Sequence, residues 1–410
     1  MRTRMIFGRF DYAIFLSFFA YAAGSTIFPL VLPNMARELG FSLTEGGMAA
    51  GGALHFGRTI PQVLTMVLCG FANGAWGMRR TLGTSVLLMG TGVLICAFAP
   101  VYAVLFLSLM VAGLGEGVVE GLATPFVQDL HPEEPGRYIN FSHSFWCVGI
   151  VVTTTICGYL LWQGVSWRWL VGSVAAIALI PALLLLLPPP KGHRHAGRHE
   201  PVHWAVVWRN AASILKMRRF WVFFAAMFVA GGGEFGITYW TASYIQLNLD
   251  AAAWASGVGI ACFAGGMFIG RTGWAYLLRQ HHLKGLIISS ALAATAITFL
   301  FPFIQNIWAV FAMLLITGLA VAPFWPSVQS FAADCLPEAD TTMLFIMLSC
   351  AGIPGCSVVT WLMGRVGDLS GGNLRPAFYI VTACFLLLAL LVAVSRAKVR
   401  NQKPAIATTP

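Results

Sequence analysis

The chain has 410 residues, of which 58% are hydrophobic and 10% are charged, and its formal net charge is +10. Soluble proteins carry roughly 25% charged residues, so a chain with so few cannot cover its surface for contact with water. The composition excludes a cytosolic enzyme, a nucleic-acid-binding protein and a secreted domain, and it predicts a surface that faces lipid.

Twelve apolar stretches are long enough to cross a bilayer, which takes about 20 residues of helix. The first follows a short basic N-terminus, and it is too long for a signal peptide. The stretches lie near 11–36, 45–73, 81–99, 101–129, 138–162, 167–188, 220–247, 251–278, 285–302, 306–332, 341–366 and 375–396. They predict an all-α integral membrane protein with twelve transmembrane helices.

One long polar segment divides these stretches into two sets of six. We expect an N-terminal bundle over 1–188, a cytoplasmic linker over 189–219, a C-terminal bundle over 220–396 and a cytoplasmic tail over 397–410. Residues 203–219 have a Trp-rich face and a basic end, which is typical of a helix on the membrane surface. The linker histidines have no carboxylate or cysteine cluster beside them, so we expect no metal site; they are His193, His195, His199 and His203.

The basic residues indicate the orientation of the chain. Most of the 25 Lys and Arg fall in loops that share one side of the membrane if the N-terminus is cytoplasmic. Cytoplasmic loops of membrane proteins are enriched in Lys and Arg. We therefore expect both termini in the cytoplasm, a multi-pass protein of the inner (plasma) membrane, and no nucleic-acid partner.

The two sets of six helices contain similar short motifs. Gly57-Arg58-Thr59 in the second span matches Gly270-Arg271-Thr272 in the eighth, and Gly113-Leu114 in the fourth matches Gly318-Leu319 in the tenth. These matches predict two pseudo-symmetric six-helix bundles. In transporters built from such repeats, the substrate site lies near the membrane midplane between the halves.

Three carboxylates lie at membrane depth, where ionisable groups are costly and usually functional. Glu116 and Glu120 are four residues apart and share a helix face. Two neighbouring carboxylates in a low dielectric do not both ionise readily, which favours a proton carrier. Either of them is alternatively a structural partner of an arginine. Glu234 is the third acid, and the three glycines before it predict a loosened helix.

Other polar and aromatic residues are candidates for substrate contact. Arg58 and Arg271 either bind an anionic or hydroxylated substrate or neutralise the carboxylates of the fourth span. An acid opposite an aromatic ring suits a sugar or polyol, and Trp325 occupies the repeat position that matches Glu120. The full set of substrate candidates is His55, Arg58, Asn140, His143, Tyr239, Trp240, Arg271 and Trp325. Nothing resembles a nucleophile elbow, a P-loop or a dinucleotide fingerprint, so we expect no enzyme and no cofactor.

The loop between the second and third spans resembles the signature GxxxDRxGRR of the major facilitator superfamily. The match consists of Gly70, Gly77, Arg79 and Arg80, and the acid of the signature is Gly74 here. The resemblance covers the whole chain. It implies the superfamily fold, transport by alternating access, and a gating role for these four residues.

A second resemblance concerns one branch of that superfamily, the fucose–galactose–glucose:proton symporters. The run Glu120-Gly-Leu-Ala-Thr-Pro-Phe126, then Arg137-Tyr-Ile-Asn140 and His143-Ser-Phe-Trp-Cys-Val-Gly149, is similar to that branch. In the branch, the carboxylate of the fourth helix takes part in proton coupling and sugar binding, and this role falls on Glu120. The chain departs at Ser25, where the branch has an acid, and at Thr124, where it has an Asn.

Together these features predict a proton-coupled secondary active transporter of a sugar or related polyhydroxylated metabolite, acting as a monomer. Glu120 is the main proton-coupling candidate, with Glu116 and Glu234 as seconds. The alternatives are an exporter or siderophore/drug transporter of the same superfamily, and a non-transporting membrane sensor or membrane-embedded enzyme.

Overall fold

The computed structural model describes residues 5–133, 135–188, 204–277 and 282–395, and a few side chains within those helices are outside the description. The first half contains α1 (Arg9–Glu38), η1 (Leu43–Glu45), α2 (Met48–Trp76), α3 (Met78–Ala97), α4 (Tyr102–Leu130), α5 (Pro135–Trp162), α6 (Trp167–Ile177) and α7 (Leu179–Leu186). The second half contains α9 (Arg218–Asn248), α10 (Ala253–Leu277), α11 (Leu283–Leu300), η3 (Phe301–Phe303), α12 (Ile307–Val321), α13 (Phe324–Cys335), α14 (Thr341–Leu369) and α15 (Phe378–Val394). Between the halves lies α8 (Trp204–Leu215).

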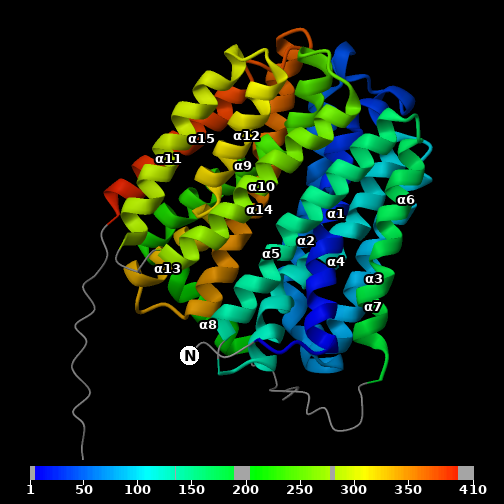
Figure 1. The fold of residues 1–410 in the computed structure, drawn as a ribbon. Helices are drawn as coiled ribbons and strands as arrows, with labels where there is room; N and C mark the ends of the chain where they lie inside the picture. Colours follow the sequence, from blue (N-terminus) through cyan, green and yellow to red (C-terminus); the bar gives the residue numbers. More distant parts are fainter. Residues whose placement is uncertain (1–4, 134, 189–203, 278–281, 396–410) are drawn as a thin grey trace, which may run out of the picture.

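The predicted all-α membrane fold is confirmed. Ten helical segments of the described chain are long and apolar enough to cross a membrane, and α2 with 29 residues and α15 with 17 complete the pattern. Each predicted span falls on one helix or on two consecutive helices. The two sets of helices stand side by side (Figure 1).

Two predicted spans are interrupted, and prolines account for both interruptions. The sixth breaks at Ala178 between α6 and α7, where Pro181 has no N–H to donate to the carbonyl of Ile177. The tenth breaks between α12 and α13, where Pro323 likewise cannot bond to Leu319. Hydropathy depends on the composition of a span and not on its hydrogen bonds, so it does not predict these breaks.

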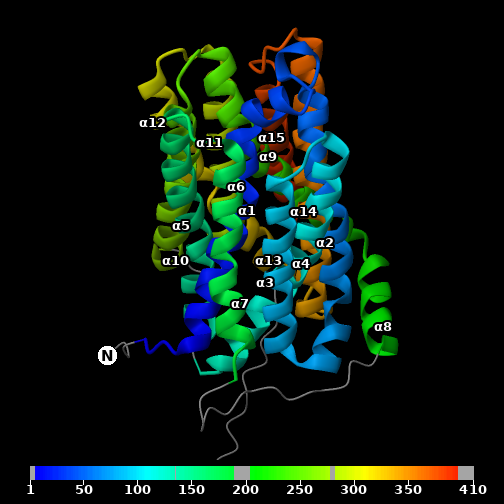
Figure 2. The ribbon, with the colours of Figure 1, turned by 90° about the vertical axis from the view of Figure 1, so that its right-hand side faces the viewer.

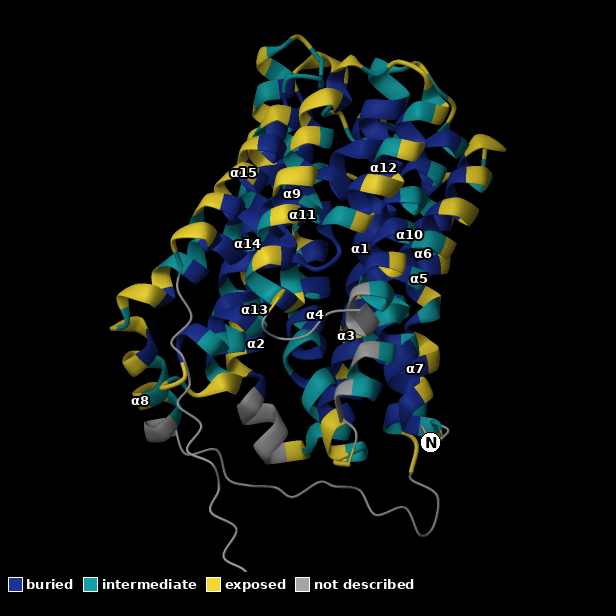
Figure 3. Cartoon of the chain, turned by 60° about the vertical axis from the view of Figure 1, so that its left-hand side comes forward, coloured by how far each residue is buried: buried dark blue, intermediate teal, exposed yellow. Residues whose placement is uncertain are grey.

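The outer faces of the helices carry large apolar side chains. Exposed residues lie on the outside of the bundle, and buried residues fill its interior (Figure 3). Leu64 and Leu390 are each 56% exposed and Phe299 is 51% exposed. Large apolar side chains exposed on helices of both halves indicate contact with lipid.

The halves meet along three helix pairs, α1 with α9, α2 with α14, and α5 with α10. We call the end where α1 begins at Arg9 the basal end, and the end where α2 begins at Met48 the apical end (Figures 1 and 2). At the apical end the pairs approach closely: a Cβ on Gly52 of α2 would lie 2.5 Å from the carbonyl oxygen of Thr360 on α14. Another on Gly158 of α5 would lie 2.9 Å from the Cα of Gly257 on α10.

Glycines set the packing within each half and keep the repeat visible in three dimensions. A Cβ on Gly113 of α4 would lie 2.1 Å from the carbonyl oxygen of Arg58 on α2. A Cβ on Gly318 of α12 would lie 2.0 Å from the carbonyl oxygen of Phe263 on α10. The matched glycines thus make equivalent contacts between the second and fourth helices of each half.

At the basal end of the first half, two arginines bind the C-terminal carbonyls of α7. Arg9 of α1 donates to Leu184, Leu187 and Pro188 at 2.8–2.9 Å. Arg79 of α3 donates to the carbonyl oxygens of Leu185, Leu186 and Leu187. The orphan carbonyls of a helix end are satisfied in this way by side chains of two other helices.

The predicted gating residues surround this basal region. Gly70 lies in α2, and Gly77 joins α2 to α3 with a left-handed φ of +78°. Arg79 contacts α7 of its own half, and Arg80 is exposed. The predicted linker helix forms as α8, while the four linker histidines and the tail lie outside the described residues.

Candidate functional site

Arg58 and Glu116 form a buried ion pair within the first half. Glycine packing brings α4 against α2, so that Arg58 Nη2 reaches Glu116 Oε1 and Nε lies 3.2 Å from Oε2. Arg58 also donates to the carbonyl oxygen of Gly24 at 2.7 Å and to Ser25 Oγ at 3.2 Å, both on α1. The side chains are 3% and 1% exposed. One arginine therefore joins three helices, with all its partners inside one half.

Arg271 and Glu234 form a second, looser ion pair in the other half. Arg271 Nη2 on α10 lies 3.3 Å from Glu234 Oε1 on α9, and Nε lies 3.4 Å from the carbonyl oxygen of Ala322 at the end of α12. The two side chains are 23% and 16% exposed. The helix that carries Glu234 is continuous, contrary to the prediction of a loosened segment. Its three glycines are contact points, because a Cβ on Gly231 would lie 2.5 Å from the carbonyl oxygen of Gly352 on α14.

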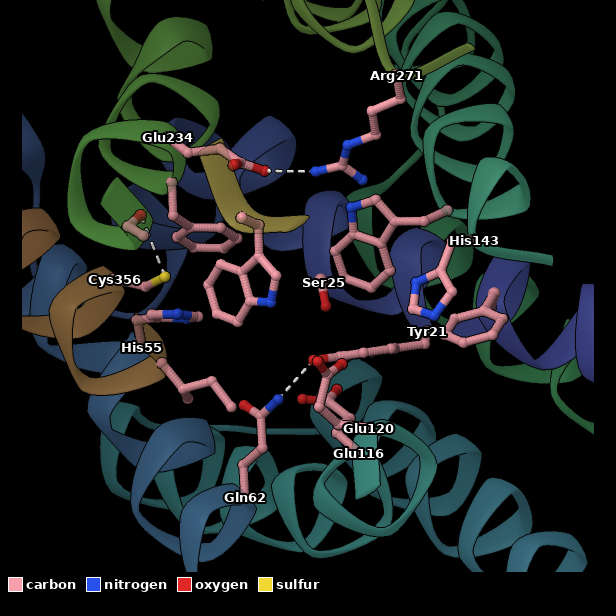
Figure 4. A pocket seen from close by; sticks show the side chains of 16 residues that line it. Tyr21, Ser25, His55, Gln62, Glu116, Glu120, His143, Glu234, Arg271 and Cys356 are labelled. Atoms are coloured by element: carbon pink, nitrogen blue, oxygen red, sulfur yellow. Dashed lines mark hydrogen bonds and ion pairs between the residues drawn. The ribbon is translucent and has the colours of Figure 1, made fainter. Parts of the chain in front are cut away.

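Both ion pairs border one cavity between the halves. Its volume is about 140 Å³. Residues from both bundles line it: Phe18, Tyr21, Ser25, His55, Gln62, Glu116, Glu120, His143, Trp146, Gly231, Glu234, Phe235, Arg271, Trp325, Ile353 and Cys356. Figure 4 shows the carboxylates of Glu116 and Glu120 on one wall and the Arg271–Glu234 pair on the opposite wall.

Glu120 differs from the other two acids of the cavity. Glu116 and Glu234 each contact an arginine. Glu120 lines the cavity one helical turn after Glu116 and has no hydrogen-bond or ion-pair partner among the described residues. It is therefore the carboxylate of this cavity whose charge depends most on what the cavity contains.

Neutral polar groups complete the wall around Glu120. Gln62 Nε2 donates to the hydroxyl of Tyr21, and His143 Nε2 lies 2.9 Å from Thr124 Oγ1. His55 stacks on Phe235 of the other half, with ring centroids 4.2 Å apart. The cavity thus combines hydrogen-bonding groups with aromatic faces.

Four of the predicted substrate residues line the cavity, namely His55, His143, Arg271 and Trp325. A fifth, Arg58, is paired with the cavity-lining Glu116. Tyr239 and Trp240 do not line the cavity. The Tyr239 hydroxyl donates to the carbonyl oxygen of Gly51, and the Trp240 indole N–H donates to that of Thr360 at 2.8 Å. A helix turns about 100° per residue, so these side chains point well away from the face that carries Glu234. The side chain of Asn140 is outside the description.

Sequence reasoning missed several neutral members of the wall, above all Tyr21, Gln62 and Trp146. They carry no charge at membrane depth, so the criterion that found the acids and arginines passed over them. The cluster of residues needed for a metal is absent from the described part of the chain.

Comparison with known proteins identifies the family. The model of the Major Facilitator Superfamily matches residues 14–339, and the chain belongs to this superfamily of secondary transporters rather than to an enzyme family. Its fold is similar to that of the fucose:proton symporter FucP of E. coli, with 18% identity, a TM-score of 0.64, and 95% of this chain and 98% of that chain covered. It is also similar to a D-xylose-proton symporter, with 14% identity, a TM-score of 0.68, and 94% and 96% covered.

A curated relative similar in sequence is the galactose-proton symporter of Escherichia coli strain K12. It is 28% identical over 183 residues, which cover 42% of this chain and 37% of that protein. The metabolite transport protein CsbC of Bacillus subtilis, described as probable, is 26% identical over 159 residues, 35% of this chain and 34% of that protein. The chain spans about a third of the length of these curated relatives.

Proposed function

We propose that the chain is a proton-coupled symporter of a sugar or a related polyhydroxylated solute. The observation that carries the proposal is Glu120, a carboxylate that faces the cavity between the halves and forms no ion pair with any residue that the structure describes. An ionised carboxylate that has no direct ion-pair partner is costly at membrane depth, and such groups are often proton carriers. The similarity to three sugar-proton symporters supports the same coupling ion and substrate class.

The wall of the cavity favours an uncharged solute. Both arginines near it are engaged by carboxylates of their own half, so among the described residues the cavity has no unpaired arginine to hold an anion. Gln62, Tyr21, His55 and His143 offer hydrogen bonds, and Trp325 and Phe235 offer apolar faces. Hydroxyl groups along one edge and C–H groups on the face of a sugar ring match such a wall.

In the proposed cycle, Glu120 takes up a proton and the cavity binds the solute, both from the same side of the membrane. With Glu120 protonated and an uncharged solute bound, the cavity carries no additional charge, and the bundles rock. Glu120 then releases its proton on the other side. Glu116 remains bound to Arg58, while the more exposed Glu234 and Arg271 face the solute.

We also propose the arrangement of the chain in the cell. The bundles comprise 1–188 and 220–396, the linker and tail are cytoplasmic, and the protein acts as a monomer in the inner membrane. The distribution of basic residues supports this orientation.

Transport by purified protein in liposomes tests the function. Radiolabelled fucose, galactose and D-xylose are the first probes, with and without an inward proton gradient. We expect Glu120→Gln to reduce gradient-driven accumulation at least tenfold and to retain exchange of solute across the membrane, because a permanently neutral side chain permits movement without carrying a proton. Glu45→Gln, a change of an exposed acid in η1, is the control. Full accumulation by Glu120→Gln would overturn the assignment.

A further inference from the structure

One carboxylate joins the two halves directly at the apical end. Asp368 lies near the end of α14, in the second half. Its Oδ1 accepts the backbone N–H of Met48 at 2.8 Å, and its Oδ2 accepts that of Ala49 at 2.8 Å. These two amides begin α2, in the first half. The acid of one bundle thus caps a helix of the other.

The physical chemistry of a helix start makes this contact strong. The first N–H groups of a helix have no partner within it, and the helix dipole places partial positive charge there. A carboxylate that accepts two of these N–H groups forms charge-assisted hydrogen bonds, which are among the strongest in proteins. The contact therefore stabilises the arrangement in which the apical ends of α2 and α14 touch.

The surrounding residues are shaped for this approach. A Cβ on Gly364 would lie 2.4 Å from the carbonyl oxygen of Met48, and one on Gly367 would lie 2.4 Å from the Met48 sulfur. The Tyr239 hydroxyl donates to the carbonyl oxygen of Gly51, and Thr59 and Ser357 share a hydrogen bond deeper along the same pair of helices. Small residues allow the backbones to meet, and Asp368 adds the charge.

We propose that Asp368 is a positioning residue for alternating access, a latch that holds the apical end closed. Its partners lie on the opposite bundle, so separation of the bundles at this end breaks both hydrogen bonds and leaves the amides of Met48 and Ala49 to water. The inference rests on the proposed rocking of the bundles, but it depends neither on proton coupling nor on the identity of the solute.

The chain offers a matched control on the same helix. Asp340 caps the start of α14 itself, where its Oδ1 accepts the N–H of Met343 at 2.8 Å. Asp340→Ala and Asp368→Ala each remove a carboxylate that caps a helix start: Asp340 caps α14 itself, and Asp368, near the other end of α14, caps α2. Only Asp368 reaches across to the other bundle, so only its loss changes the balance between closed and open apical ends.

Single-molecule fluorescence energy transfer tests the latch in full-length protein reconstituted in nanodiscs. Fluorophores are attached through non-canonical amino acids at Gln163 and Gln305, exposed positions on loops of the first and second halves at the apical end. We expect Asp368→Ala to raise the ratio of open to closed molecules about tenfold, because charged hydrogen bonds are lost in the closed state alone. Asp368→Asn, which keeps the shape and loses the charge, should raise it less, and Asp340→Ala should leave it unchanged.

Two results would overturn the proposal: an unchanged ratio in both Asp368 variants, or an equal rise in Asp340→Ala. The measurement needs no transported solute and no proton gradient. The latch proposal and the proposed function can therefore fail independently. The Asp368 variants can leave the ratio unchanged while proton-driven transport is observed, or they can change the ratio while no proton coupling is found.

Discussion

Arg58 and Arg271 occupy matching positions in the two halves but pair with carboxylates on different helices. One of these ion pairs is structural, and the other is adaptable. In both halves the arginine of the second helix contacts the first and fourth helices of its own bundle. Arg58 finds its carboxylate on the fourth helix, as Glu116, and a hydroxyl on the first. Arg271 finds its carboxylate on the first helix, as Glu234, and a backbone carbonyl at the end of the fourth.

Exposure decides what each pair can do. Arg58 and Glu116 are almost fully buried and share several hydrogen bonds, so opening this pair would leave a charge buried without a partner. Arg271 and Glu234 are partly exposed to the cavity, and a single longer contact of 3.3 Å joins the two side chains. In the proposed function, a hydroxylated solute replaces part of that contact. The repeat thus supplies one rigid wall and one adaptable wall.

The largest effect should come from breaking the buried pair. Arg58→Met leaves Glu116 buried without its cation, and we expect it to lower the free energy of unfolding by about 3–5 kcal/mol. Thermal unfolding followed by tryptophan fluorescence in detergent measures the change. Arg80→Met, at an exposed arginine, is the control. A loss no larger than that of the control would mean that the pair is not a structural element of this half.

The matching change in the other half should cost much less. Arg271→Met removes a longer contact that is already partly solvated, so we expect a loss of about 1 kcal/mol. The same unfolding measurement applies. We expect its effect on transport to exceed its effect on stability, since Arg271 lines the cavity. Equal destabilisation by Arg58→Met and Arg271→Met would remove the distinction between the two walls.

The smallest effect should come from Ser25→Ala. This change removes one acceptor of Arg58, at 3.2 Å, and leaves Glu116 and the carbonyl oxygen of Gly24 in place. We expect a loss of about 0.5–1 kcal/mol. A loss comparable to that of Arg58→Met would show that α1, rather than α4, holds the arginine in position.

The fold followed from the sequence because a bilayer imposes a length and an apolar composition on each helix. The breaks at Ala178 and Pro323 did not follow, because they depend on single missing hydrogen bonds. The acids and arginines of the site also followed, because charge at membrane depth is rare. The spacing of Glu116 and Glu120 gave them a common face, but it could not show that Arg58 reaches one and leaves the other to the cavity.

Aromatic residues were the least predictable part of the site. Trp325 lines the cavity, whereas Tyr239 and Trp240 bond to backbone carbonyls at the contact with α2 and α14. All three lie in apolar helices with similar composition. Their roles depend on the rotation of each helix about its axis, which tertiary packing determines.

The capping of α7 by Arg9 and Arg79 has a mechanical consequence. Because side chains from α1 and α3 hold the same helix end, these three helices are fastened into one stiff block at the basal end. A stiff block turns about a pivot instead of bending, and its displacement grows with distance from that pivot. In the proposed rocking of the bundles, a small rotation about the central cavity would therefore produce a larger displacement at the basal end.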